Sequence, residues 1–406
     1  MQLPWRAADF HSDPYTSYQA LRTMPPIFTD EGFWVVARYS DVAAVLKDPH
    51  FGNAEVRLAQ NAEPTLSAAA ERPGGAQMRQ VLVRSHQLIN MWLGAANPPS
   101  HSRLRAAHNP GFSQVSVARL LPRIQAAVDD LLDEVQAAGE MDLMASVAGP
   151  LPVAIISHLL DLPAADVPRL KSWSDALLRL LDMDLKLAAY QKGLLSMAAF
   201  AQYLRPVIAA RRRAPDGDLI SLLLRAEANG QLSADEVLAN SINLFMAGQE
   251  TTMAAIGSSV LALLRHPEQL RRLRAEPKLM PGAVEEFLRY DAPVQIAWRT
   301  VIADVDLFGC AFRKDQRVEL LLGAANRDSE RFLEPDEIVL DRKPNPHLGF
   351  GQGIHYCLGA HQARLQVEVA LSTLLRRLPE LALHERPPEW AQSLRLRRLK
   401  SLWVRF

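Results

Sequence analysis

The sequence predicts a mainly α-helical protein with small β-sheets, folded as a single domain over residues 1–406. Amphipathic segments with helical spacing of their apolar residues dominate the chain, whereas strand patterns are brief. No internal repeat and no long linker divides the sequence. A chain of 406 residues exceeds the size at which single cores usually stop growing, so length alone favours several domains. Because no linker separates such domains, we expect one large domain.

Near the N-terminus the sequence predicts a β-hairpin, because residues 26–29 and 33–36 are largely apolar and enclose Asp30-Glu31-Gly32. The uncharged run 143–160 is about long enough to span a bilayer. Its glycine and two prolines favour a loop followed by a buried helix instead. Other amphipathic segments predict helices over 117–138, 167–182, 194–212 and 361–377.

The clearest helix is expected over residues 232–265. It opens with a capping box, Ser233-Ala234-Asp235-Glu236, and closes at Arg265-His266-Pro267. Its middle, Ala247-Gly248-Gln249-Glu250-Thr251-Thr252, is poor helix material, because an interior glycine costs up to about 1 kcal/mol and threonine crowds the preceding turn. Either the glycine admits a neighbouring helix, with Glu250 on a solvated face, or the interruption serves a function.

Charge and cysteine content limit the classes of protein. The chain has 45 basic and 45 acidic residues, which argues against a global nucleic-acid or membrane footprint. Its two cysteines, Cys310 and Cys357, offer no disulfide framework if Cys357 binds a metal, and this fits a reducing cytoplasm. The N-terminal residues 1–6 lack an apolar targeting core, so no membrane anchor is expected.

The most informative segment is Phe350-Gly351-Gln352-Gly353-Ile354-His355-Tyr356-Cys357-Leu358-Gly359. Its glycines allow backbone conformations that let the chain approach a flat ligand. Cys357 lies near the start of an expected helix, where the partial positive charge favours a thiolate. His355 could reach a carboxylate. A cysteine alone is often a small buried hydrophobe, but the whole pattern indicates a thiolate ligand for haem iron.

Two further motifs are weak when taken singly. Glu286-Phe287-Leu288-Arg289 places a carboxylate and a guanidinium on one helical face, which in most proteins makes a surface ion pair. Upstream, the segment 97–105 places His101 and Arg105 one helical turn apart, where both could act as hydrogen-bond donors to carboxylates.

Taken together, these motifs run in order from residue 97 to 364 and resemble those of the cytochrome P450 family. The cysteine loop is similar to the family's F-G-x-G-x-H-x-C-x-G, residues 247–251 to the A-G-x-[DE]-T of its oxygen-binding helix, and residues 286–289 to its E-x-x-R. Weaker likeness extends over the rest of the chain. Departures are small and put only local packing in doubt: Asn97 and Ser100 replace residues that are usually acidic, and Ile338 stands where an aromatic is common.

The resemblance implies a P450 fold with a long central helix over a non-covalent haem b, since no C-x-x-C-H attachment pattern exists. Cys357 would bind the iron, Thr251 would orient protons and Glu250 would relay them. Glu286, Arg289 and Arg342 would form a structural ion-pair network. Donors to the haem propionates would be His101, Arg105, Arg299 and His355. Other cofactor contacts would come from Ala247, Gly248, Phe350, Gly351 and Gly359, and the substrate pocket would include Asn243, Met246, Ala247, Val294 and Ile296.

The implied activity is insertion of one atom of dioxygen into a C–H bond or alkene of a lipophilic small molecule. The resemblance also implies a monomer in the cytoplasm that receives electrons from a ferredoxin and a ferredoxin reductase. Three alternatives remain: a haem-thiolate gas or redox sensor, a related fold that recruits partners without turnover, and a peroxide-driven peroxygenase. A sensor need not keep Glu250 and Thr251, and a peroxygenase often dispenses with the alcohol.

Overall fold

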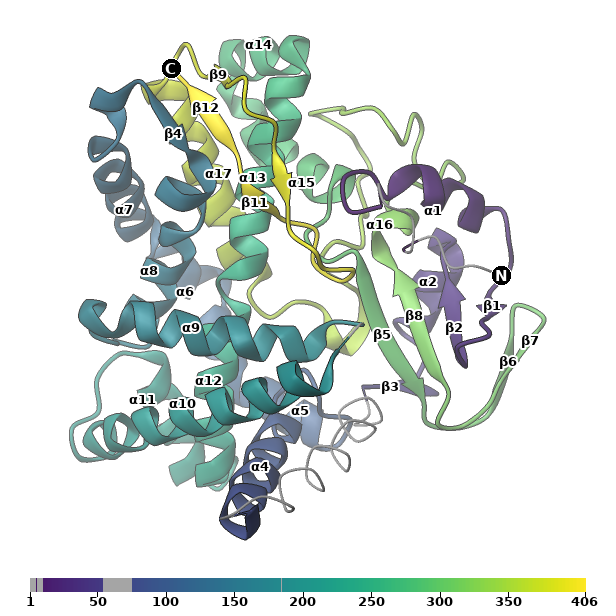
Figure 1. Ribbon diagram of the computed structural model, residues 1–406, viewed down its shortest axis with the longest axis vertical. Coiled ribbons are helices and arrows are strands. Elements are labelled where there is room, and N and C mark those ends of the chain that lie inside the picture. The colour runs from purple at the N-terminus through teal and green to yellow at the C-terminus, as the bar shows by residue number, and fades with distance from the viewer. Residues whose placement is uncertain (1–4, 6–9, 54–74, 184) are drawn as a thin grey trace. The chain divides into compact units, whose positions relative to one another are not determined.

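The computed structural model describes residues 5, 10–53, 75–183 and 185–406 (Figure 1). Apart from Trp5, the expectation for residues 1–6 lies outside the described residues. The chain forms two compact units. Unit 1 consists of Met1–Phe51, Gln114–Pro152 and Gln249–Phe406, and unit 2 consists of Gly52–Ser113 and Val153–Gly248.

A five-stranded sheet, which lies almost entirely in unit 1, has the strand order β1-β2-β8-β5-β3. Its strands are β1 Ile27–Phe28, β2 Phe33–Val36, β3 Phe51–Gly52, β5 Ile296–Val301 and β8 Arg317–Leu321. The expected hairpin is confirmed, because β1 and β2 pair antiparallel with Ile27 opposite Val35, and Gly32 in the turn has φ +81°.

Strand β2 also pairs in parallel with β8, although nearly 300 residues separate them, and β5 runs antiparallel to β8. Figure 1 shows β2, β8 and β5 side by side. Apolar side chains from the sheet and from α2 (Tyr39–Val45) form one buried cluster, which includes Val36, Val42 and Leu320. The parallel pairing was not expected from the sequence, since it joins segments from opposite ends of the chain.

The other strands described in unit 1 form three smaller sheets. One has the order β4-β12-β9, and two antiparallel pairs are β10-β11 and β6-β7. Their bounds are β4 Glu140–Asp142, β6 Val305–Leu307, β7 Cys310–Phe312, β9 Ala382–Leu383, β10 Glu389–Trp390, β11 Leu399–Ser401 and β12 Trp403–Arg405. With helices in the majority, the expected class of a mainly α protein with small β-sheets is confirmed.

In unit 1, α17 contacts four other helices, α6, α7, α13 and α15. The helix bounds are α1 Tyr15–Arg22, α6 Gln114–Ala118, α7 Leu121–Asp133, α13 Glu250–Arg265, α14 Pro267–Ala275, α15 Met280–Tyr290, α16 Leu322–Ala325 and α17 Ala360–Arg377. Short 3-10 turns are η3 Gln136–Ala138, η7 Pro277–Leu279 and η8 Gly353–His355.

Two sequence expectations, for residues 117–138 and 143–160, were partly wrong. The helix expected over 117–138 is divided into α6, α7 and η3, and Pro122 lies in the first turn of α7, where a proline is tolerated. The run 143–160 starts with a π-helical turn, η4 (Met144–Ala148), rather than a loop, and continues as α8 (Pro150–Leu159). The turn η4 contacts α13, where Gly257 leaves room for Met144.

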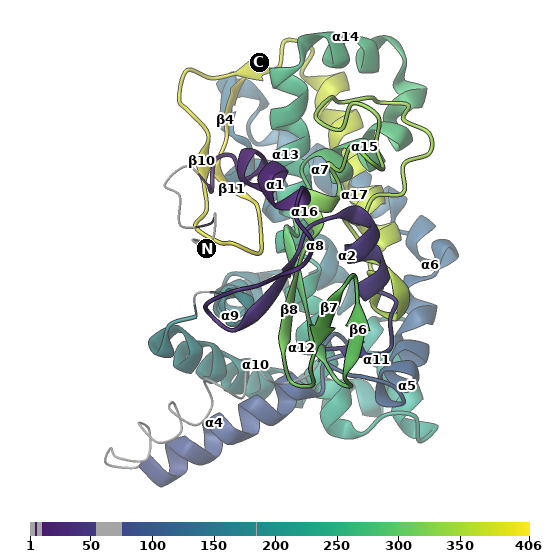
Figure 2. The ribbon, with the colours of Figure 1, turned by 90° about the vertical axis from the view of Figure 1, so that its right-hand side faces the viewer.

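Unit 2 consists mainly of helices packed around α10 (Leu187–Arg213), which contacts α4, α9, α11 and α12 (Figures 1 and 2). The other bounds are α4 Gly75–Asn90, α5 Ser100–His108, η2 Asn109–Phe112, η5 Ala164–Asp166, α9 Val167–Leu178, η6 Arg179–Leu181, α11 Leu219–Ala228 and α12 Ala234–Ala247. Among the described helices, α10 is long and apolar enough to cross a bilayer by length and composition. It packs against four helices, as a core helix of this unit does.

The single helix expected over 232–265 is interrupted, and this part of the expectation was wrong. Its ends are as expected: Ser233 and Glu236 form the capping box of α12, and α13 ends at Arg265 before His266 and Pro267. Between the two helices, Gly248 and Gln249 form a turn. The weak helix propensity noted in the sequence lies at this turn.

Candidate functional site

Backbone hydrogen bonds shape the loop that presents Cys357. The Cys357 amide donates to the Phe350 carbonyl at 3.0 Å, and the Gly351 amide donates to the Leu348 carbonyl at 2.8 Å. Gly351 and Gly353 adopt φ angles of +68° and +74°, which favour glycine. A Cβ on Gly353 would also lie 2.5 Å from the Leu46 carbonyl oxygen. The sequence therefore folds here into a tight loop that only glycine permits.

The surroundings of Cys357 fit a flat, metal-bearing group. Cys357 is half-buried and lies three residues before α17. The positions that a Cβ on Gly351 or Gly359 would occupy face open space, so the loop leaves room beside the cysteine. Among the described residues, no three His, Cys, Asp or Glu side chains gather to hold a metal ion. A single protein thiolate is the donor set that suits haem, whose macrocycle supplies the other ligands.

A buried cation on β5 favours an anionic ligand. Arg299 is 5% exposed and donates to the Trp298 carbonyl at 2.8 Å. Desolvation by burial lowers the pKa of Arg299 to about 10, so a neighbouring anion would stabilise its charged form. His355, also expected to contact a carboxylate, is half-buried at the end of η8. Both residues belong to unit 1, as does Cys357.

Unit 2 contains the remaining residues expected to contact a cofactor. His101 is buried and Arg105 lies one turn later on α5, where it donates to Asn109. Along α12, the residues from Val237 onward are buried except Asn243 and Ala247, which are four apart and so share a face. Met246 is buried, and Gly248 is half-buried in the turn that follows.

The other residues expected to line the substrate pocket lie in unit 1. Val294 is half-buried and Ile296 is fully buried at the start of β5.

At the start of α13, an acid and an alcohol lie side by side in the sequence with different surroundings. Glu250 is 5% exposed, and its Oε2 lies 3.1 Å from Nε of Arg398, a residue of the C-terminal segment just before β11. Thr251 is the one residue of α13 from Glu250 to Leu263 that is not buried, whereas Thr252 is 3% exposed. The sequence reasoning missed Arg398; the basic cluster Arg395-Leu396-Arg397-Arg398 was a signal that it could have used.

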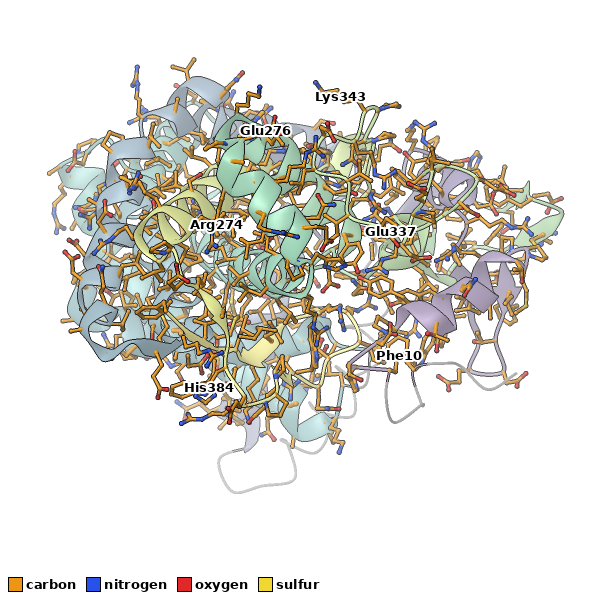
Figure 3. The ribbon with its side chains drawn as sticks, turned by 90° about the horizontal axis from the view of Figure 1, so that it is seen from above. Phe10, Arg274, Glu276, Glu337, Lys343 and His384 are labelled. Atoms are coloured by element: carbon orange, nitrogen blue, oxygen red, sulfur yellow. The ribbon has the colours of Figure 1, made fainter. Side chains whose placement is uncertain are left out.

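Glu286 on α15 is the centre of a largely buried network. Its carboxylate accepts from Nε and Nη2 of Arg289 at 2.8 Å each and from Nε of Arg342 at 3.1 Å, and it also accepts from the Val339 amide and the Asn345 side chain. Glu286 and Arg289 are both 0% exposed. The carbonyl of Glu337, a residue labelled in Figure 3, accepts from Nη2 of Arg289 at 2.8 Å and from Nη2 of Arg342 at 3.3 Å. The expected contact of Arg342 with Glu286 is therefore present.

Comparison with known proteins identifies the family to which these features belong. The sequence matches the family described as "Cytochrome P450" over residues 169–394. It is 35% identical over 404 residues to "Biotin biosynthesis cytochrome P450" of Bacillus subtilis (strain 168), covering 98% of each chain. The chain belongs to the cytochrome P450 family. This P450 is also 36% identical over 410 residues to "Cytochrome P450 monooxygenase PikC" of Streptomyces venezuelae, covering 98% of this chain and 92% of that protein.

Solved P450 structures agree in fold. The structure of P450BioI in complex with an acyl carrier protein ligated to hexadec-9Z-enoic acid matches with a TM-score of 0.89 at 34% identity, over 98% of this chain and 100% of that one. A P450 from Bacillus megaterium in complex with testosterone matches with a TM-score of 0.87 at 28% identity, over 98% and 99%. The expected fold, the haem b cofactor and the class of haem-thiolate monooxygenase are thereby confirmed.

Proposed function

We propose that Cys357 is the thiolate ligand of the haem iron and that this P450 oxidises a C–H bond or alkene of a lipophilic small molecule. The shape of the cysteine loop is the observation that carries the proposal. Two left-handed glycines and the hydrogen bond of the Cys357 amide shape the loop around a half-buried cysteine, and there is open space beside Gly351 and Gly359. Bound haem supplies activation of dioxygen, which a thiolate ligand favours by donating electron density.

The chain's own residues would deliver protons to the site of oxygen binding. Thr251, accessible on an otherwise buried stretch of α13, would donate and accept hydrogen bonds there. Glu250 would exchange protons with Thr251 on one side and with solvent on the other, where Arg398 is 34% exposed. His101, Arg105, Arg299 and His355 would hold the propionates, and Ala247, Gly248, Phe350, Gly351 and Gly359 would contact the macrocycle.

A lipophilic substrate fits the apolar residues proposed for the pocket, Met246, Ala247, Val294 and Ile296, with Asn243 as a polar partner. The named relatives and structures point to chemically different substrates: a fatty acyl chain on a carrier protein, and a steroid. We propose a fatty acyl, polyketide, terpenoid or steroid substrate. A spectral binding screen across these classes measures which one changes the absorption spectrum of the haem-loaded protein.

The remaining expectations are proposals about the whole protein. Electrons would come from a ferredoxin and a ferredoxin reductase, and the protein would be a cytoplasmic monomer without affinity for nucleic acid. It would fold as one domain over residues 1–406, because neither unit is continuous in sequence: the chain passes between them after Phe51, Ser113, Pro152 and Gly248.

The test of Cys357 is the absorption spectrum of the reduced protein with carbon monoxide. A thiolate ligand gives a strongly red-shifted Soret band, which Cys357→Ser should abolish. Cys310→Ser is the matched control, because Cys310 is the other cysteine of the sequence and its replacement should leave the band unchanged. A band typical of histidine-ligated haem in the folded wild-type protein would refute the assignment. Turnover with a ferredoxin pair, compared with peroxide alone, separates a monooxygenase from a peroxygenase or a sensor.

A further inference from the structure

A second carboxylate on α15, next to Glu286, connects two other elements of unit 1. Glu285 accepts two hydrogen bonds from Arg364 of α17, from Nε at 2.6 Å and from Nη2 at 2.9 Å. Its Oε2 also lies 3.0 Å from Nε2 of His347. Neighbouring residues of a helix point about 100° apart, so Glu285 and Glu286 reach different parts of the same segment. Glu286 holds residues 339–345, and Glu285 holds the part nearer the cysteine.

Arg364 contacts both ends of the cysteine loop. Its guanidinium carbon lies 4.4 Å from the centre of the Phe350 ring, and its Nη1 donates to the Tyr356 hydroxyl at 3.1 Å. Phe350 is the residue whose carbonyl accepts the Cys357 amide, and Tyr356 directly precedes Cys357 in the chain. One side chain therefore links Glu285 of α15 to side chains at both ends of the loop that leads into Cys357.

His347 completes the contact from the upstream side. Its side chain is 3% exposed, and its Nδ1 accepts from the Gly349 amide at 3.1 Å. Because Nδ1 accepts, the proton lies on Nε2, which donates to Glu285. Gly349 can take no side chain here, since a Cβ would lie 2.8 Å from the Leu288 carbonyl oxygen of α15. The segment entering the loop is thus held closely against α15.

An ordinary surface ion pair would contribute little, since exposed pairs are typically worth no more than about 1 kcal/mol. The Arg364 and Glu285 side chains are 27% and 30% exposed. However, Arg364 makes two hydrogen bonds to Glu285 instead of one. In addition, the buried His347 contacts the Glu285 carboxylate, and the Phe350 ring contacts the Arg364 guanidinium. Desolvation raises the pKa of Glu285, but the hydrogen bonds from His347 and Arg364 outweigh it and bring that pKa to about 2. The carboxylate is therefore stabilised in its charged form.

We propose that Glu285, Arg364 and His347 form a charged clamp that positions Cys357 as the iron ligand, in addition to the Glu286 network. The inference rests on the proposed role of Cys357. Partners of this kind, which orient a metal ligand without touching the metal, tune how firmly the ligand is held. If the clamp is lost, the loop opens locally and the thiolate leaves the iron while the rest of the protein stays folded.

The experiment compares the holoprotein carrying Arg364→Gln with that carrying Arg377→Gln. Arg377 lies on the same helix, is 20% exposed and pairs with Asp129 and Asp133, away from the cysteine loop. Two quantities are measured: the rate at which the red-shifted carbon monoxide band is lost in urea below the unfolding transition, and hydrogen exchange of the Gly351 and Cys357 amides. Arg364→Gln should raise both rates by roughly tenfold, as expected when a charged hydrogen-bond partner is removed. Arg377→Gln should change them by less than about twofold.

Further variants test the contacts of the clamp one at a time. They also keep the proposal testable if Arg364→Gln does not fold. Arg364→Lys keeps the charge but not the planar fork, so its rates should lie between those of wild type and Arg364→Gln. Glu285→Gln weakens the contacts with Arg364 and His347 by removing the negative charge, and Tyr356→Phe removes one hydrogen bond; each should raise the rates by less than Arg364→Gln does. If these variants and Arg364→Gln match Arg377→Gln in both rates, the clamp does not position Cys357. A wild-type protein without the red-shifted band would instead refute the proposed role of Cys357.

Discussion

Thr251 and Thr252 carry the same hydroxyl group and differ by one position, yet their surroundings differ. Thr251 is accessible, whereas Thr252 is 3% exposed among the buried residues of α13. Neighbouring helix residues point about 100° apart, so only one of the two can face a bound ligand on a given side. The accessibility of Thr251 supports its proposed role in proton delivery.

Replacing Thr251 with alanine should uncouple oxygen consumption from product formation. Without the Thr251 hydroxyl, proton delivery to the site loses its direction, so peroxide should rise and product per oxygen consumed should fall by about tenfold or more. Oxygen uptake, peroxide and product are measured together, with Thr252→Ala as the control. A coupled Thr251→Ala, or a stronger effect in Thr252→Ala, contradicts the proposed relay. The substrate used should lack a hydroxyl, which could replace the missing alcohol.

Glu285 should make the stability of the protein depend on acidity in a defined window. Its pKa falls from 4.5 to about 2 on folding, so its contribution is complete above pH 4.5 and is lost as pH falls through 2. Below about pH 4.5 the unfolded state takes up the proton first, which favours unfolding. Urea unfolding of wild type and Glu285→Gln between about pH 6 and pH 3 measures this. The difference in free energy of unfolding should shrink as pH falls; a constant difference would contradict the ion pair.

At the scale of elements, α15 organises the segment that leads to the cysteine. Glu286 and Arg289 project from it into the interior, and Arg289 also donates to the carbonyls of Asn326, Pro335 and Glu337. Gly282 lets the Leu340 carbonyl oxygen approach to 2.7 Å of the position that a Cβ would occupy. Buried charged side chains of a helix can thus hold a long irregular segment, because they form hydrogen bonds with the backbone groups of that segment.

Glu286→Ala should greatly reduce the yield of haem-loaded protein. Removing the carboxylate leaves Arg289 buried without its counter-charge, and breaking a buried pair from one side costs roughly 3–5 kcal/mol. Haem content and urea unfolding measure the effect. Glu276→Ala is the control: Glu276, labelled in Figure 3, is 44% exposed and lies 3.8 Å from Arg272. If both variants keep normal haem content and stability, the Glu286 pair is not structural.

At the scale of the whole molecule, the chain passes between its two units four times, at 51/52, 113/114, 152/153 and 248/249. The last passage coincides with the interruption between α12 and α13. Neither unit is therefore made by one continuous stretch of chain, and each needs segments from several parts of the sequence. This arrangement supports the proposal of a single folding domain.

The two units should consequently unfold in one transition. The slowest-exchanging amides of α10, a core helix of unit 2, and of α17, which contacts four other helices of unit 1, should give the same free energy of opening within about 1 kcal/mol. Native-state hydrogen exchange across a urea series measures both helices in one sample. Two separate free energies, with the amides of one unit exchanging while the other stays protected, would show two domains instead of one.

The sequence alone determined those features of this P450 that depend on near neighbours. The hairpin around Gly32, the capping box at Ser233, the end of α13 before Pro267 and the cysteine loop all follow from turn residues, side-chain caps and glycine conformations within a few positions. The order of motifs also sufficed to place the chain in its family, because each motif is a short local pattern.

Only the tertiary structure decided which distant segments meet. The parallel pairing of β2 with β8, the ion pair of Glu250 with Arg398 and the contact of Glu285 with Arg364 join residues 79 or more positions apart. Glutamate and arginine side chains occur throughout the sequence, and most such pairs lie on the surface. Which carboxylate is buried beside which guanidinium depends on how the helices and strands pack, because the packing removes water from both charges at once.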